Sequence, residues 1–154
     1  MTQACGSEPW PLPGLLDVTA LGRRIAALLR AGDVVALSGP LGAGKTTLAR
    51  AILTGAGYAG EVPSPTFTIL ETYDPPAVRL PIVHADFYRL NHPLEAEELG
   101  LDDYRAGAAL LAEWPEKAGG FAGESGYLGI VLQVEGNGRM AHIDRGPEWR
   151  ERGF

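Results

Sequence analysis

The chain has 154 residues, of which 45% are hydrophobic and 21% are charged. This length fits one domain of ordinary size, and the composition excludes a wholly disordered chain. The formal net charge is −6, from 13 basic and 19 acidic residues. A protein that binds nucleic acid by itself usually carries a basic patch, and the sequence contains no basic run. Any role on nucleic acid is therefore expected to pass through a partner.

The sequence also bears on where the protein works. Its single cysteine, Cys5, excludes an internal disulfide and is typical of a reducing compartment. No apolar run approaches the roughly 18 residues of a membrane span, and the first residues lack the basic start and apolar run of a secretory signal. We therefore expect a cytoplasmic protein.

Strands and helices are expected to alternate along the chain. Residues 1–17 contain several prolines and predict an N-terminal tail or an edge segment. A helix is expected over residues 20–30, with Thr19 as its cap and Gly32 as its stop. A wholly apolar strand at 34–37 then leads through a loop at 39–44 into a helix at 45–53. Further strands are expected at 66–73, 79–85, 108–114, 127–134 and 140–144, short helices at 93–99 and 101–105, and a C-terminal tail at 146–154.

This order of elements predicts an α/β fold. Its central sheet is expected to be mainly parallel, with antiparallel strands at the flanks, and to occupy residues 18–145. Ligands of such sheets bind at the carboxyl ends of the strands. The motifs described next occupy those ends.

The segment GPLGAGKT, residues 39–46, matches the Walker A phosphate-binding pattern. Its glycines allow the backbone to curl closely around a phosphate, and its exposed amides form an anion nest. Lys45 is expected to reach the β- and γ-phosphates, and the Thr46 hydroxyl to bind Mg²⁺. A chance glycine-rich turn is the alternative, but the motif follows an apolar strand and opens a helix, as its mechanism requires. The residues expected to contact the nucleotide here are Gly39, Pro40, Leu41, Gly42, Ala43, Gly44, Lys45, Thr46 and Thr47.

The phosphate loop makes the expected fold a three-layer fold of the P-loop NTPase type, and ATP is the expected nucleotide. The Asn-Lys-x-Asp segment that indicates guanine specificity is absent from the sequence, and so is a compact arginine cluster typical of a kinase lid. Because Lys45 is expected to open a helix at the surface, its replacement by alanine should abolish hydrolysis and leave the melting temperature unchanged.

Three further residues are candidates for the chemistry. Asp86 and Glu113 each follow an apolar strand, and either could serve as the acidic partner of Mg²⁺. Each could instead cap the next helix or pair with an arginine such as Arg89, and the residues alone do not rank them. Thr66 lies where P-loop switch proteins sense the γ-phosphate, although a proline turn entering a strand explains the same pattern.

Four motifs that follow the phosphate loop in order carry a family resemblance. They are SPTFTILETY (64–73), HADFYRL (84–90), EELGLDDY (97–104) and LLAEWPEK (110–117). With GPLGAGKTTLAR, this set resembles the TsaE (YjeE) family, the bacterial ATPases required for threonylcarbamoyladenosine synthesis on tRNA. The resemblance spans about residues 18–145. Pro40 stands where the family usually has Asp, and Ala85 where it often has Phe, but neither position binds phosphate or metal.

The resemblance implies a weak ATPase that acts with the TsaB and TsaD proteins and meets tRNA only through that complex. The reaction it implies is formation of the threonylcarbamoyl group on adenosine 37 of tRNAs that read codons beginning with A. It also implies that Glu113 and Thr46 bind Mg²⁺, that Asp86 orients the attacking water or a metal-bound water, and that Thr66 senses the γ-phosphate or positions water.

The remaining candidates are weaker. Glu116 and Arg139 are expected to reach the ribose or base of the nucleotide, as is Lys117. His84 is interpreted as a core histidine, and Trp114 either as a core aromatic or as part of the site.

The favoured hypothesis is an ATPase whose hydrolysis resets a tRNA-modifying complex. A small-molecule kinase that uses the same loop is the rival, and a nucleotide-dependent interaction protein is a third possibility. A switch would hydrolyse ATP slowly alone, whereas a kinase would turn over briskly with its acceptor.

Overall fold

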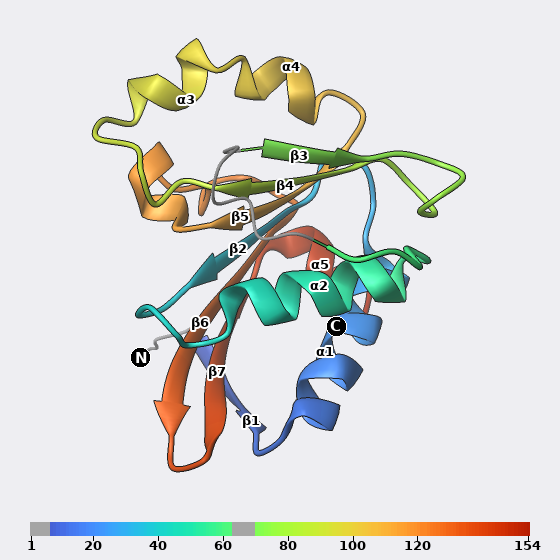
Figure 1. The fold of residues 1–154 in the computed structure, drawn as a ribbon, viewed down its shortest axis with the longest axis vertical. Coiled ribbons are helices and arrows are strands. Elements are labelled where there is room, and N and C mark those ends of the chain that lie inside the picture. Colours follow the sequence, from blue (N-terminus) through green and yellow to red (C-terminus); the bar gives the residue numbers. More distant parts are fainter. Residues whose placement is uncertain (1–6, 63–69) are drawn as a thin grey trace.

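A computed structural model describes residues 7–62 and 70–154 of the chain, and one seven-stranded sheet runs through this part. The β6–β2, β2–β5 and β5–β4 pairs are parallel. The β1–β7, β7–β6 and β4–β3 pairs at the flanks are antiparallel. The mixed sheet predicted from the sequence is therefore confirmed (Figure 1). In spatial order the strands are β1 (Ser7–Leu12), β7 (Gly138–Arg145), β6 (Tyr127–Glu135), β2 (Val34–Ser38), β5 (Ala109–Glu113), β4 (Ile82–Asp86) and β3 (Leu70–Tyr73).

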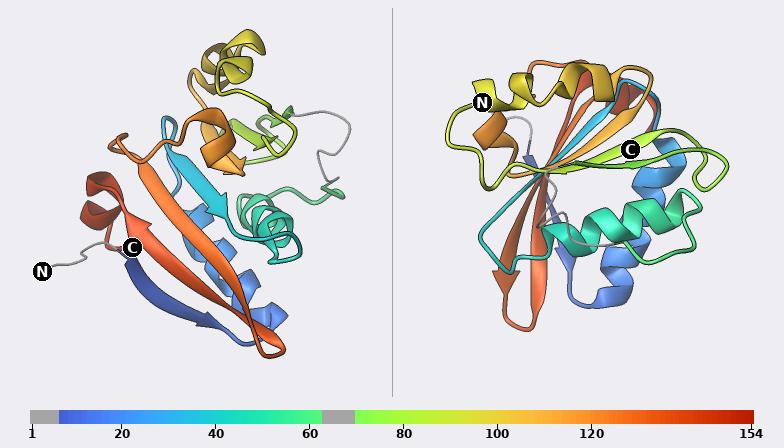
Figure 2. Two further views of the ribbon diagram at one scale, coloured as in Figure 1. Left: turned by 90° about the vertical axis from the view of Figure 1, so that its left-hand side faces the viewer. Right: turned by 45° about the horizontal axis from the view of Figure 1, so that its top comes forward.

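Helices cover both faces of the sheet and complete three layers (Figures 1 and 2). Helices α1 (Leu15–Leu28) and α2 (Lys45–Gly55) lie side by side on one face. Their approach is close, because a Cβ atom on Gly22 of α1 would lie only 2.4 Å from the Cβ of Ala51. The opposite face carries the short helices α3 (Leu94–Glu98) and α4 (Leu101–Arg105) and the 3₁₀ turn η1 (Pro115–Ala118).

Each face of the sheet packs its own hydrophobic core. Successive residues of a strand point to opposite faces, and β5 shows this clearly. Leu111 contributes to the core under α1 and α2, whereas Leu110 contributes to the core under α3 and α4. All of β5 is buried, which explains why its sequence is a continuous apolar run rather than an alternating one.

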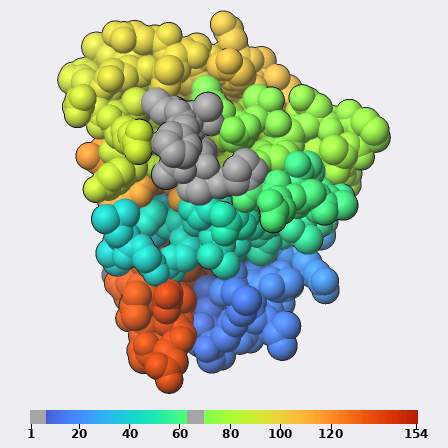
Figure 3. Space-filling model, viewed as in Figure 1, coloured from blue at the N-terminus to red at the C-terminus, as the bar shows by residue number. Residues whose placement is uncertain are grey.

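The phosphate loop lies between the two ends of the molecule. It connects β2 to α2, and in the space-filling view this part of the chain, coloured teal, separates the α3–α4 end from the β6–β7 hairpin (Figure 3). The carboxyl ends of β2, β4 and β5 meet beside it, because these three strands are parallel neighbours. The ligand edge that the sequence predicted is thus formed at the loop.

The first helix starts earlier than the sequence suggested, and Thr19 is not its cap. Helix α1 begins at Leu15, where the N–H of Gly14 donates to the Asp17 carboxylate over 2.9 Å. The Thr19 hydroxyl lies inside the helix and donates to the carbonyl of Leu15. Asp17 therefore satisfies an unpaired N–H at the helix start, so it takes the capping role predicted for Thr19.

The N-terminal segment, expected to be a tail or an edge segment, and the C-terminal segment, expected to be a tail, both contribute packed elements. Residues 7–12 form the edge strand β1, where Pro9 and Pro11 are tolerated because an edge strand can lack an N–H donor. Near the other end, Trp149 of α5 (Pro147–Glu151) is fully buried, and its indole N–H donates to the carbonyl of Gly126. Arg152 forms a buried ion pair with Asp33.

One expected strand begins later than predicted, and the predicted range of another lies partly outside the described residues. Strand β4 starts at Ile82 because Pro81 cannot donate a ladder hydrogen bond. Arg79, expected in the strand, instead donates to the carbonyls of Ala26 and Leu29 at the end of α1. Strand β3 starts at Leu70, and residues 66–69 of its predicted range lie outside the described residues. A search of the described helices for one long and apolar enough to cross a membrane found none.

Candidate nucleotide-binding site

The phosphate loop has a backbone that depends on glycine at its first position. Gly39 adopts a φ of 139°, and a Cβ atom there would lie 2.4 Å from the carbonyl oxygen of Leu132 on β6. Within the loop, the N–H of Ala43 donates to the carbonyl of Pro40 over 3.1 Å. The loop is therefore a folded turn packed against the neighbouring strand. Leu41 at its tip is 69% exposed.

Lys45 is buried, so its predicted place at the surface is wrong. Its ammonium group donates to the carbonyls of Gly39 and Pro40 over 2.7 and 2.9 Å, and the side chain is only 5% exposed. Burial lowers the pKa of Lys45, against the raising effect of Glu113, Asp86 and Glu116. The physical reason is that the carbonyls of the loop bind the ammonium group and hold it against the loop.

Thr46 and Glu113 meet at the ends of α2 and β5. The Thr46 hydroxyl donates to Oε1 of Glu113 over 2.8 Å. Glu113 is 2% exposed, and its other oxygen, Oε2, lies 2.6 Å from Nε2 of His84, which acts as the donor. Both carboxylate oxygens are thus fixed in place. The two residues that the resemblance assigned to Mg²⁺ are brought together.

His84 is the residue whose role the sequence missed. It is fully buried, as predicted for a core histidine, but its ring holds Glu113. Its Nδ1 atom finds no hydrogen-bond partner among the described residues, so Nε2 is the ring nitrogen that makes the contact with Glu113. The signal that could have found this role is the position of His84 two residues before Asp86, on a strand next to that of Glu113.

Asp86 lies beside Glu113 across neighbouring parallel strands, where the two residues are in register. Its carboxylate accepts a hydrogen bond from the backbone N–H of Tyr88 over 3.0 Å. Burial raises the pKa of Asp86, and the negative charge of Glu113 raises it further, while the Tyr88 hydrogen bond, His84 and Lys45 oppose the shift. Asp86 is therefore a carboxylate with a strengthened affinity for a proton.

Trp114 and Tyr88 form an aromatic wall next to the lysine. Trp114 adopts a left-handed backbone with a φ of 56°, a conformation that is costly for a bulky side chain. The Nζ atom of Lys45 lies 4.4 Å from its ring centroid, and the Tyr88 ring lies 4.9 Å away. Of the two interpretations open for Trp114, its contact with Lys45 favours the one in which it shapes the site.

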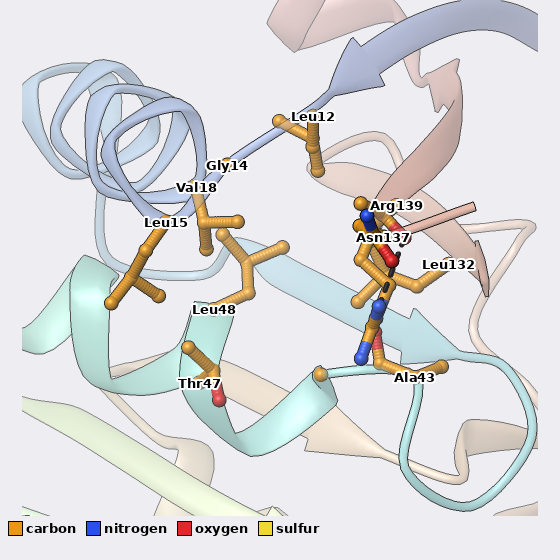
Figure 4. A pocket seen from close by; sticks show the side chains of 12 residues that line it. Leu12, Gly14, Leu15, Val18, Ala43, Thr47, Leu48, Leu132, Asn137 and Arg139 are labelled. Carbon is orange, nitrogen blue, oxygen red and sulfur yellow. Dashed lines mark hydrogen bonds between the residues drawn. The ribbon is translucent and has the colours of Figure 1, made fainter. Parts of the chain in front are cut away.

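A pocket of about 250 Å³ opens on the other side of the loop (Figure 4). Leu15 and Val18 of α1 form one wall, and Arg139 of the hairpin forms the other, with Thr47 at the start of α2. Arg139 donates to the carbonyls of Ala43 and Gly42 over 3.0 and 3.1 Å. Glu116 is not among the described residues that line this pocket, and its charge acts on Lys45 instead.

The structure thus gathers most of the residues selected from the sequence at one edge of the sheet. Thr66 lies outside the described residues. Among the part of the chain that the structure describes, no group of three or more His, Cys, Asp or Glu side chains is arranged to hold a metal. A hydroxyl and a single carboxylate are compatible with Mg²⁺, which usually keeps several waters and takes substrate phosphates as ligands.

The fold and the loop together define a P-loop protein of the NTPase type. Residues 13–141 match the family model described as "Threonylcarbamoyl adenosine biosynthesis protein TsaE". This match covers most of the sequence, so the chain belongs to the TsaE family.

Known relatives and a solved structure agree with this assignment. A protein from Streptomyces coelicolor named "tRNA threonylcarbamoyladenosine biosynthesis protein TsaE" is 50% identical over 97 residues, which cover 62% of this chain and 66% of the relative. A protein of the same name from Haemophilus influenzae is 38% identical over 123 residues, covering 76% and 77%. The crystal structure of YdiB from Bacillus subtilis superposes with a TM-score of 0.72 at 27% identity, covering 94% of this chain and 90% of that one.

Proposed function

We propose that this protein is a magnesium-dependent ATPase that acts in the biosynthesis of threonylcarbamoyladenosine on tRNA. The observation that carries the proposal is the hydrogen bond between Thr46 and Glu113, next to a complete phosphate loop. The names of relatives that are 38–50% identical support the pathway. The modified base is adenosine 37 of tRNAs that read codons beginning with A, as the family resemblance implies, and the work takes place in the cytoplasm.

The phosphates of ATP bind to the amides of the loop and to Lys45. The ammonium group of Lys45 then exchanges the carbonyls of Gly39 and Pro40 for phosphate oxygens, a stronger charge-assisted interaction. The ribose and base occupy the 250 Å³ pocket beside Thr47. The apolar wall that Leu15 and Val18 form in this pocket suits a flat heterocycle. The charge of Glu116 acts on Lys45, and the Nζ atom of Lys117 lies 5.8 Å from the centroid of the Tyr88 ring.

The chain offers oxygen ligands suited to Mg²⁺. The Thr46 hydroxyl and the Glu113 carboxylate are hard donors at hydrogen-bond distance from each other. Bound Mg²⁺ would neutralise developing charge on the β- and γ-phosphate oxygens. His84 keeps the Glu113 carboxylate in one orientation through its Nε2–H, as partners of metal ligands commonly do.

Asp86 accepts a hydrogen bond from the attacking water. It lies beside Glu113 and keeps one oxygen fixed by the Tyr88 N–H, which leaves its other oxygen to orient the water. Its raised pKa favours acceptance of a proton. Thr66 is proposed to sense the γ-phosphate, as the resemblance implies. Turnover by the isolated chain is expected to be slow, as the family resemblance implies.

The protein is proposed to act with TsaB and TsaD and to meet tRNA only through them. Its net charge is −6, so the counterion release that drives non-specific nucleic-acid binding is largely unavailable to it. A nucleotide switch changes a partner's affinity by its differential contacts, typically about 1–3 kcal/mol. Association with the TsaB–TsaD pair is therefore expected to be several-fold tighter with an ATP analogue than with ADP.

The test is a light-scattering titration of the TsaB–TsaD pair with a non-hydrolysable ATP analogue, with ADP and without nucleotide. A gel shift of the lone protein with tRNA at physiological salt serves as the control. Association that ignores the nucleotide, or tight binding of tRNA by the isolated chain, would contradict the proposal. Brisk ATP turnover only with a small-molecule acceptor would identify a kinase instead.

A further inference from the structure

Arg139 reaches the phosphate loop from a distant part of the chain. It belongs to β7, yet its Nε donates to the carbonyl of Ala43 and its Nη2 to that of Gly42, nearly a hundred residues earlier. Its Nη1 donates to the carbonyl of Gly138 on its own strand, over 2.9 Å. Figure 4 shows the side chain extended along the loop, with its guanidinium group next to Ala43.

These contacts orient the loop amides. In a trans peptide the C=O of one residue and the N–H of the next point in opposite directions. A guanidinium group that holds the carbonyls of Gly42 and Ala43 therefore turns two N–H groups to the other side: that of Ala43, which donates to the carbonyl of Pro40, and that of Gly44. The positive charge of the arginine also lies close to a loop that would bind an anion.

The hairpin supports the loop at a second point. The carbonyl of Leu132 on β6 lies so close to Gly39 that a Cβ atom there would meet it at 2.4 Å. The β6–β7 hairpin thus contacts the loop at its first glycine and again at Gly42 and Ala43. This arrangement restricts the loop from one flank before any nucleotide binds.

We propose that Arg139 is a positioning residue that holds the phosphate loop in the conformation that binds the nucleotide's β-phosphate, and that it acts through the loop carbonyls rather than on the nucleotide. The proposal rests on the ATP-binding function proposed above. Since apparent affinity falls in proportion to the population of the competent conformation, loss of this support weakens binding of every nucleotide that carries a β-phosphate.

The test compares ADP, a non-hydrolysable ATP analogue and AMP, each measured by isothermal titration with wild type, Arg139→Met and Arg139→Lys. Arg145→Met is the matched control, because Arg145 lies on the same strand but binds Glu8 and the carbonyl of Phe154, away from the loop. If the competent population falls about tenfold, affinity for ADP and for the ATP analogue falls about tenfold in Arg139→Met. Affinity for AMP, which lacks the β-phosphate and can lose only the contact with the pocket wall that Arg139 forms, falls by much less. The KM for ATP rises while kcat is kept.

Arg139→Lys keeps the charge but replaces the planar guanidinium group, with its five donors in a fixed fork, by a single ammonium group on a flexible stem. An intermediate loss is therefore expected, and this milder variant decides the question if Arg139→Met does not fold. Wild-type ADP affinity in the Arg139 variants, with the wild type itself binding ADP, would overturn this inference alone. So would a loss confined to the ATP analogue, which indicates direct contact with the γ-phosphate, or an equal loss for AMP, which indicates contact with the base. Failure of the wild type to bind ADP would remove the proposed function and this inference together.

Discussion

The packing of Gly39 against the hairpin predicts a large loss of stability on replacement by alanine. At a φ of 139°, an alanine is strained by about 1–3 kcal/mol. Its Cβ would also meet the Leu132 carbonyl at 2.4 Å, where real Cβ atoms do not come below 3.0 Å. Such overpacking against backbone typically costs about 1–3 kcal/mol. The free energy of unfolding should therefore fall by about 2–6 kcal/mol in Gly39→Ala.

Gly42→Ala is the matched control in the same loop. Gly42 also has a positive φ, of 81°, but a Cβ atom there would have no heavy atom within 4 Å. Its replacement carries only the left-handed strain of about 1–2 kcal/mol, partly offset by the lower entropy of the unfolded chain. The difference between the two variants thus comes mainly from the contact with Leu132, with a smaller part from the different backbone strain at the two positions.

Urea denaturation of both variants without nucleotide measures this difference, because no ligand then contributes to stability. Wild type is expected to be the most stable, followed by Gly42→Ala and then Gly39→Ala. The dependence of the unfolding free energy on urea concentration should be the same in all three proteins. Equal losses in the two variants would refute the reasoning, because they would mean that the loop does not pack against β6.

Two further predictions concern the acidic residues. Glu113→Gln should shift the Mg²⁺ dependence of ATP binding more than Asp86→Asn does, because Glu113 is the carboxylate that contacts Thr46. Titration with Mg²⁺ measures both shifts, and a larger shift in Asp86→Asn would reverse the two roles. Burial raises the pKa of Asp86 above its ordinary 3.8, so the folded state favours the protonated carboxyl group. The stability that this protonated group contributes is fully present below pH 3.8 and is lost as the pH rises through the pKa of the folded state. Asp86→Asn should therefore raise the Tm of the nucleotide-free protein at pH 7, and the gain should vanish towards pH 3.8; an equal gain at every pH would contradict the shift.

The central elements could be predicted because several signals agree there. The apolar run before Gly39, the phosphate loop and the buried run that ends at Glu113 specify β2, α2 and β5, and all three are confirmed. The start of α1 could not be predicted, since Asp17 and Thr19 offer alternative ways to satisfy the first amides and tertiary contacts decide between them.

The details of the site depend on long-range contacts that a single sequence does not contain. The role of His84 follows from the pairing of β4 with β5, which places its ring against Glu113. The contact of Arg139 with the loop follows from the position of the hairpin beside β2. The burial of Lys45 arises because its ammonium group binds the loop carbonyls of Gly39 and Pro40.

The most direct test of the account is ATP binding and hydrolysis by Lys45→Ala. Loss of its hydrogen bonds to the Gly39 and Pro40 carbonyls should destabilise the fold by about 1 kcal/mol, which lowers the Tm by about 2–4 °C. The variant remains folded at 25 °C. Wild type is expected to bind ATP in a Mg²⁺-dependent way and to hydrolyse it slowly, and the folded variant should show no turnover. Wild-type turnover in Lys45→Ala would contradict the assignment of residues 39–46 as the phosphate site.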